Sequence, residues 1–194
     1  MVSDRGQAHT LEAFMASLLL IGGVAFALQV TAVTPLTAST SSQHVENQQL
    51  QVARGLLDSA VQNGTLKEAV LYWNASSGTF QNSSEEGYYA TGGPPTEFGK
   101  MLNRTFRHHG IAFNVNVVYV GGGGGFKTDE MVHFGEPSDH AVSARRTLTL
   151  YDDDELTGKY SGTVNRTDSF FVPEIAPKSG VYNVIRVEVI VWRM

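Results

Sequence analysis

The chain has 194 residues, of which 42% are hydrophobic, and this is enough for one domain of ordinary size with a core of its own. Its formal net charge is −5, from 19 acidic and 14 basic residues, and no basic cluster occurs, so nucleic acid is not an expected partner. Cysteine is absent, which excludes disulfides, thiolate metal sites and a cysteine nucleophile.

An apolar segment lies close to the N-terminus. From Ala13 to Val33 the chain carries no charged residue, and Gln29 is the only strongly polar side chain there. A helix of this length rises by about 1.5 Å per residue and spans the roughly 30 Å hydrocarbon core of a bilayer. Arg5 precedes the segment and the next basic residue is Arg54, so the positive-inside bias predicts a single-pass protein of the cell membrane with a cytoplasmic N-terminus and an exported head.

Three kinds of N-terminal segment fit this pattern. A cleaved secretory signal has a basic start, a short apolar stretch and small residues at the cut, which Ala25-Phe26-Ala27 would supply. A plain signal anchor would stay attached to the chain. The third kind is a short polar leader that is cut before a retained apolar helix, and Gly6 and Glu12 are the residues that bear on it.

Beyond the apolar segment, Thr34-Pro35 predicts a kink or a helix end. A polar stretch follows, and apolar residues then recur near helical spacing, which predicts a helix over about 43–62 that ends near Asn63-Gly64. The two parts together predict a long N-terminal helix with a membrane-spanning first half and an amphipathic second half.

The remaining residues predict a small head of helix and sheet. Residues 65–74 form an apolar element of unassigned type, and residues 81–95 are rich in turn formers. Thr96 is expected to cap a helix that stops at Gly110. Alternating apolar residues predict strands at about 111–119, 126–134, 141–151 and 182–193. Helices first and strands last favour an α+β fold with an antiparallel sheet.

Several motifs invite an enzyme interpretation, and each has a plainer one. Gly121–Gly125 lacks the Gly-Lys-Ser/Thr order of a phosphate loop and is expected to be a hairpin loop. Asp152–Glu155 lacks the spaced ligands and the glycine of a calcium loop, so a solvated turn is expected. Four histidines lack the i, i+4 spacing with a glutamate that a zinc-binding helix has, so we expect them to be surface residues: His108, His109, His133 and His140. We therefore expect no catalysis, no cofactor and no metal site.

The sequon Asn-x-Ser/Thr occurs more often than the composition leads one to expect. The candidate acceptors are Asn63, Asn74, Asn82, Asn103 and Asn165. Asn, Ser and Thr also gather in turns for conformational reasons, so loop composition is the alternative. The excess favours an exported surface that can be glycosylated.

The first fifty residues resemble archaeal type IV pilins and pilin-like proteins, through "RGQAHTLEAF" and the "LLLIGGVAFALQVTAVTPLTASTSSQHVENQQ" stretch after it. With "RRTLTLYDDDEL" and the ending "NVIRVEVIVWRM", the chain is similar to an uncharacterised pilin-like family of haloarchaea. In such proteins a leader peptidase removes a short leader, commonly after glycine, and a glutamate follows the cut. Cleavage between Gly6 and Gln7, which we favour, makes Glu12 the sixth residue; cleavage after Gln7 makes it the fifth, as in most pilins.

The resemblance implies an organisation and a set of partners. Residues 1–6 are the leader, 7–36 the apolar helix in a membrane or filament core, 37–64 an amphipathic helix or stalk, and 65–194 the extracellular α+β head. Other pilin-like subunits, the membrane platform for pilus assembly, the leader peptidase and membrane lipid are the implied partners. Glu12 would pair with the new α-amino group of a neighbouring subunit, whereas the plainer interpretation is a carboxylate that reaches back to water.

These observations rank three functions. The first is a structural, pilin-like subunit of minor or accessory rank in a type IV pilus-like filament or its membrane platform, because the head is short and has no repeat. The second is a membrane-anchored extracellular binding or adhesion module whose N-terminus is only a tether. The third is a secreted enzyme, which ranks last because no set of acid, base and nucleophile is visible.

Overall fold

The computed structural model describes the backbone of residues 3–167 and 169–194, and the side chains of residues 9–29, 43–167 and 169–194. The chain divides into two compact units, residues 1–45 and residues 46–194, and the second unit is called the head below. The described part of the first unit is helical and contains an apolar span, and the head combines helices with an antiparallel sheet. This confirms the predicted α+β class.

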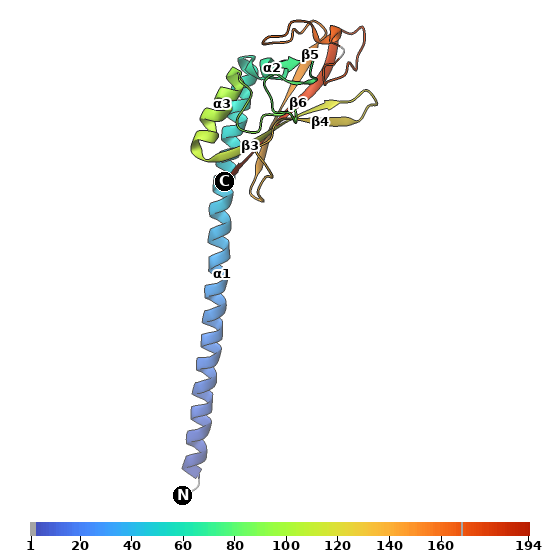
Figure 1. The fold of residues 1–194 in the computed structure, drawn as a ribbon. Coiled ribbons are helices and arrows are strands. Elements are labelled where there is room, and N and C mark those ends of the chain that lie inside the picture. The colour runs from blue at the N-terminus through green and yellow to red at the C-terminus, as the bar shows by residue number, and fades with distance from the viewer. Residues whose placement is uncertain (1–2, 168) are drawn as a thin grey trace. The chain divides into compact units, whose positions relative to one another are not determined.

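Residues 3–45 of the first unit lie within α1 (Ser3–Gln62), whose last turns belong to the head (Figure 1). Within α1, the span His9–Gln29 is long and apolar enough to cross a membrane, judged by length and composition alone. Its apolar side chains are exposed, as in Leu19 at 75%, and this is compatible with a single-pass anchor or a signal sequence. The helix continues through Thr34 and Pro35, so α1 does not end there.

The last turns of α1 pack into the head. Ala53, Leu57 and Ala60 are fully buried, whereas Val52 on the other side of the helix is 42% exposed. The unit boundary after Val45 falls inside the segment 37–64, which the sequence predicts as an amphipathic helix or stalk. The end of the helix agrees with the prediction: α1 stops at Gln62, and Gly64 follows at a φ of 74°, a conformation that favours glycine.

Two further helices lie beside the last turns of α1 (Figure 1). The element of unassigned type at 65–74 begins as helix α2 (Thr65–Val70), and α3 (Glu97–Thr105) begins just after Thr96, as predicted. The Thr96 hydroxyl, however, makes no capping hydrogen bond and is buried without a partner. The observed helix is also shorter than the predicted one, because α3 ends at Thr105. The 3-10 helix η1 (Arg107–His109) then leads to Gly110, whose φ is 69°.

The head contains two antiparallel sheets. The strands of the larger sheet follow the predicted ranges closely. That sheet has the order β4-β3-β6-β5, with strands β3 (Ile111–Val120), β4 (Phe126–Val132), β5 (Val142–Tyr151) and β6 (Val181–Arg193). The smaller sheet, which the sequence did not predict, pairs β1 (Trp73–Asn74) with β2 (Thr79–Phe80). A 3-10 helix, η2 (Val164–Arg166), lies in the connection from β5 to β6.

One face of the larger sheet forms the core with the helices. Val115 of β3 lies opposite Val189 of β6, and Val117 lies opposite Val187, and all four side chains have no exposed surface. The alternation that predicts these strands therefore identifies their buried face correctly. Burying one such side chain contributes about 1.5–3 kcal/mol to folding, so the central strands anchor the head.

A charged pair fixes α1 against β5. The Arg146 guanidinium donates from Nη2 to Oδ2 of Asp58 at 2.6 Å and from Nε to Oδ1 of the same carboxylate. These hydrogen bonds hold the pKa of Asp58 below its ordinary range. Because both side chains are partly exposed, the pair orients the two elements and contributes little net stability.

Candidate functional sites

The first candidate site is the N-terminal end of the apolar span. Glu12 is 80% exposed, and its Oε2 lies 3.7 Å from Nδ1 of His9, one helical turn before it. A carboxylate at the edge of an apolar helix needs a cation or water, and His9 supplies a local partner when it is protonated. The side chains of Gly6 and Gln7, the predicted cleavage residues, lie outside the described ones.

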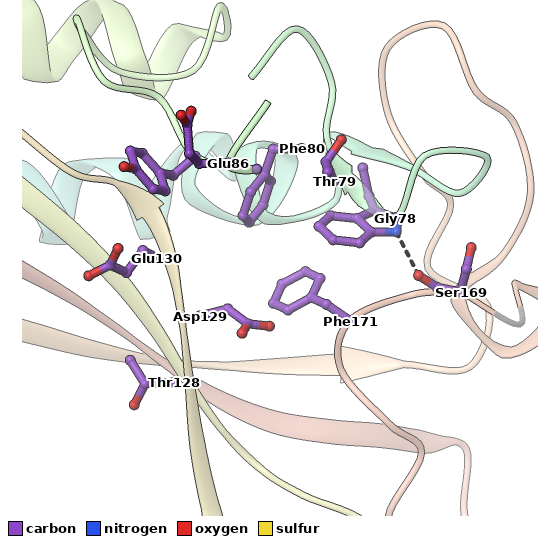
Figure 2. A pocket seen from close by; sticks show the side chains of 12 residues that line it. Gly78, Thr79, Phe80, Glu86, Thr128, Asp129, Glu130, Ser169 and Phe171 are labelled. Carbon is purple, nitrogen blue, oxygen red and sulfur yellow. Dashed lines mark hydrogen bonds between the residues drawn. The ribbon is translucent and has the colours of Figure 1, made fainter. Parts of the chain in front are cut away.

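The second candidate site is a groove of about 570 Å³ in the head (Figure 2). One wall is the stretch Thr128–Glu130 of β4, and the other is formed by the turn at 78–80 and the loop at 86–88. In Figure 2, Asp129 extends from β4 toward Phe171, which lies below Phe80. The groove thus brings together segments that are far apart in the chain.

Local hydrogen bonds build the turn on one side of the groove. The Asn74 side-chain oxygen accepts the backbone N–H groups of Ser76 at 3.0 Å and Ser77 at 3.3 Å, which folds the chain back after β1. Gly78 completes the turn at a φ of 67°, a conformation that glycine adopts without strain. The turn brings Phe80 opposite Trp73 in the two-stranded sheet.

Aromatic rings form the floor of the groove. The ring of Trp73 packs edge-on against that of Phe80, with 5.2 Å between the ring centroids. The ring centroid of Phe171 lies 5.4 Å from that of Phe80 and 5.8 Å from that of Tyr119. The Trp73 indole N–H donates to the Ser169 carbonyl at 2.9 Å, as the dashed line in Figure 2 marks. The floor is therefore rigid, because packing and a hydrogen bond hold its rings.

Carboxylates give the groove a negative charge. Glu86, Asp129 and Glu130 line it, and no lysine or arginine does so among the described residues. The Tyr119 hydroxyl donates to Oδ2 of Asp129 at 3.0 Å, and burial, together with the Asp129 charge, raises the pKa of Tyr119 to about 12. Tyr119 thus stays a neutral donor at ordinary pH. A carboxylate beside aromatic rings suits an ammonium or guanidinium group.

Of the motifs that invite an enzyme interpretation, only His133 lies next to a described residue that lines the groove, Glu130. Gly121–Gly125 forms the β3–β4 hairpin loop, with the Gly121 N–H donating to the Gly125 carbonyl at 2.7 Å, so the hairpin prediction is confirmed. Asp154 caps the turn after β5 by accepting the Tyr151 N–H at 2.8 Å. His140 lies 2.8 Å from Glu46 of α1, and His133 lies 3.2 Å from Glu130. In the described part of the chain no three His, Asp or Glu side chains are placed to hold a metal.

The five sequons differ in how accessible their amides are. Asn63, Asn82 and Asn165 are exposed, whereas Asn74 and Asn103 are half-buried. The Asn74 oxygen is held in the turn after β1, and the Asn103 oxygen on α3 is buried without a hydrogen-bond partner. A glycan on Asn103 would therefore have to displace packed atoms.

We expect glycosylation to follow this difference. In glycopeptide mapping of the chain from its own cells, glycan should be found on Asn63, Asn82 or Asn165 and not on Asn103, because the transferase must reach the side-chain amide. The matched comparison is Asn82 with Asn103, since both have a complete sequon. Occupancy of Asn103 equal to that of Asn82 would contradict the prediction.

Sequence reasoning missed the groove. The predicted strand near 126–134 contains one wall and the predicted loop at 81–95 contains part of the other, but nothing local indicates that they face each other. The usable signal was the aromatic pair Trp73 and Phe80 around a turn sequence, which is typical of a short hairpin.

Comparison with known proteins gives a family without an assigned function. A family model, described as a family of unknown function (DUF7288), matches residues 5–191. No curated protein and no solved structure matches the chain. The matched range contains both the apolar span and the whole groove.

Proposed function

We propose that this chain, which belongs to the DUF7288 family of unknown function, is a pilin-like structural subunit of minor or accessory rank. It would serve a type IV pilus-like surface filament or the membrane platform that assembles it. The observation that carries the proposal is an exposed apolar span, His9–Gln29, with the single carboxylate Glu12 near its start.

The physical argument concerns how that span is covered. Its side chains are exposed along the whole helix, so they need lipid, other helices, or both. Cleavage between Gly6 and Gln7 by a leader peptidase would create an α-amino group at the start of this helix. The Glu12 carboxylate of one subunit can then pair with the amine of its neighbour. Because either charge alone is costly to bury among apolar helices, this pairing favours side-by-side packing of the helices.

The proposal places the parts of the chain as follows. The helix lies in the membrane before assembly and in the filament core afterwards, with other pilin-like subunits as neighbours. The head lies outside the cell, where the sequons would be accessible to glycosylation. No step of this function requires a cofactor.

Replacing Glu12 with alanine tests the proposal. We expect incorporation into filaments sheared from cells, or into the membrane-bound assembly, to fall about tenfold or more, because an unpaired ion in an apolar setting costs several kcal/mol. The readout is the ratio of assembled to total protein by immunoblot in an archaeal host that builds such filaments. N-terminal peptide mapping of the same samples gives the cleavage site.

The control is His9→Ala. It removes the neighbour that Glu12 contacts in this structure but leaves the carboxylate free for an amine of another subunit. We expect His9→Ala to assemble as the unchanged chain does. Normal incorporation of Glu12→Ala would remove the basis of the proposal, and an uncleaved N-terminus would remove the amine that it requires.

The second candidate function is a membrane-anchored binding module, and the groove favours it. A rigid aromatic floor with the Asp129 carboxylate beside it suits a ligand with an ammonium or guanidinium group. In this case the apolar helix is only a tether, so an unrelated membrane anchor in place of residues 1–33 should keep surface binding of cationic ligands. Loss of surface function on that exchange would favour the pilin-like subunit instead.

A further inference from the structure

The two outer strands of the larger sheet both have an open edge. On β4, the Tyr89 N–H donates to the Met131 carbonyl at 3.0 Å and the His133 N–H donates to the Tyr89 carbonyl at 3.1 Å, which covers one end of the strand. Along Phe126–Glu130, no strand or backbone hydrogen bond covers the side away from β3 among the described residues. These backbone groups are available to another strand.

The opposite edge of the sheet is open as well. β5 pairs with β6 from Val142 to Tyr151, and in the described part of the head nothing pairs with its other side. A single chain thus presents two edges without a partner strand, and Tyr89 covers one end of the β4 edge. On β5, Asp154 accepts the Tyr151 N–H at 2.8 Å, and Nη1 of Arg146 donates to the Arg145 carbonyl at 2.7 Å. Open edges of this kind associate with other strands unless something prevents it.

The two edges carry opposite charges in matching positions. Asp129 lies opposite the buried Val117, so it belongs to the core side of the sheet, and Arg146 on β5 is on that same side, next to Asp58 of α1. Glu130 and Arg145, the adjacent residues in each strand, therefore belong to the outer face. The acidic pair Asp129 and Glu130 on β4 thus matches the basic pair Arg146 and Arg145 on β5, with one residue of each pair on each face. Lys127, the other charged residue of β4, lies on the core side with Asp129.

We propose that the open part of β4 in one copy of the chain, Phe126–Glu130, pairs antiparallel with residues 145–149 of β5 in a second copy. The partner strand leaves the edge before Ala144, because Tyr89 already bonds to the Met131 carbonyl. In the register that matches the charges, Glu130 lies opposite Arg145 and Asp129 opposite Arg146, and Thr128 then lies opposite Thr147. A shift by one residue would put every side chain on the wrong face. Each guanidinium has five N–H donors, so its bonds to Glu188 or Asp58 leave N–H groups for a second carboxylate.

The direction of the strands agrees with this pairing. β4 runs antiparallel to β3, β3 to β6 and β6 to β5, so β4 and β5 of one head are antiparallel to each other. Pairing β4 with the β5 of another copy continues this alternation, and both copies keep the same strand direction. The contact joins two different surfaces and leaves one open edge on each copy, so it extends into a row.

The inference deepens the proposed function by naming a contact between heads, and it rests on the premise that copies of the chain assemble.

The absence of cysteine gives a direct test. The variant Thr128→Cys with Thr147→Cys, made in the full chain and oxidised with copper phenanthroline in membranes, should give a ladder of dimers, trimers and longer species on non-reducing gels. Within one chain, β3 and β6 separate the two positions by about 14 Å at roughly 4.8 Å per strand. A disulfide requires Cα atoms about 4.4–6.8 Å apart, so the ladder reports contacts between copies.

The matched control moves one cysteine along the same face of β5. Thr128→Cys with Ser143→Cys places the second thiol about 13 Å from the proposed partner position, and we expect at least tenfold less ladder. Glu130→Arg in the first pair should reduce the ladder as well, because it sets arginine against Arg145. An equal ladder from both pairs, no ladder from the first, or a dimer from Thr128→Cys alone would overturn the pairing.

Glu12→Ala separates this inference from the proposed function. A missing ladder in a chain that still assembles through Glu12 means that the edge pairing fails and the proposed function stands. A ladder that persists, together with normal assembly of Glu12→Ala, means that the edge pairing stands and the role of Glu12 fails. The mild substitutions at exposed Thr128 and Thr147 leave the core untouched, and tryptophan fluorescence of the reduced samples checks that the head is folded.

Discussion

Replacing Gly99 with alanine is expected to lower the free energy of unfolding of the head by about 3 kcal/mol or more. A Cβ on Gly99 would lie 1.8 Å from the Pro94 carbonyl oxygen and 2.8 Å from the Gly93 carbonyl carbon. Both are backbone atoms, so no side-chain rotation relieves the clash, and the loop before α3 would have to move. Because a domain is stable by only about 5–15 kcal/mol, the variant should be close to unfolding.

The measurement is denaturant unfolding of the full chain in detergent, followed by tryptophan fluorescence. Both tryptophans, Trp73 and Trp192, are buried in the head and report on it. The control is Gly55→Ala on α1, where a Cβ meets nothing within 4 Å. Alanine is a better helix former than glycine, so Gly55→Ala should stabilise by up to about 1 kcal/mol. Equal stability of Gly99→Ala and the unchanged chain would mean that α3 does not approach the loop as closely as described.

Replacing Leu57 with alanine is expected to destabilise the head by about 2–5 kcal/mol. Leu57 is fully buried on the head-facing side of the segment that the sequence predicts as an amphipathic helix or stalk. Its removal leaves a cavity between α1 and the rest of the head, and the neighbouring side chains can fill that space only in part. The same fluorescence-detected unfolding measures the loss.

Val52→Ala is the matched control for Leu57→Ala. Val52 lies on the same helix but is 42% exposed, so its truncation should change the unfolding free energy by no more than about 0.5 kcal/mol. If Leu57→Ala is as mild as Val52→Ala, the turns of α1 after residue 46 are a free stalk. A large difference between them would show that the head needs these turns to fold, and a truncated head should then begin no later than Glu46.

Local pattern was sufficient for the larger elements of the head. The alternation from Ile111 to Tyr119 and along the last strand predicts β3 and β6 and their buried faces, because side chains alternate across a strand whatever its neighbours are. Glycine predicts the end of α1 just before Gly64 for an equally local reason, its tolerance of positive φ, whereas α3 ends at Thr105, before the predicted stop at Gly110. The capping bond expected from Thr96 does not form, since packing around the start of α3 outweighs the preference of one side chain.

The sites were less accessible to sequence reasoning. Glu12 and the sequons are visible as residues in a pattern, and their roles stay predictions. The groove was not predicted, because Asp129 and Phe171 come from segments that are distant in the chain and meet only in the folded head. Tyr119 likewise gains its partner Asp129 through the register of β3 and β4, which no single strand specifies.

By itself, the sequence determined what depends on neighbours along the chain: an apolar span able to cross a membrane, the ranges of the main strands, the α+β class, and the absence of cysteine chemistry. Only the tertiary structure decided the strand order, the approach of Gly99 to Pro94, the pairing of Asp58 with Arg146 and the open edges of β4 and β5. The reason is physical. Backbone preference and side-chain periodicity act over a few residues, whereas strand order and close contacts are set by how the whole head closes around one core.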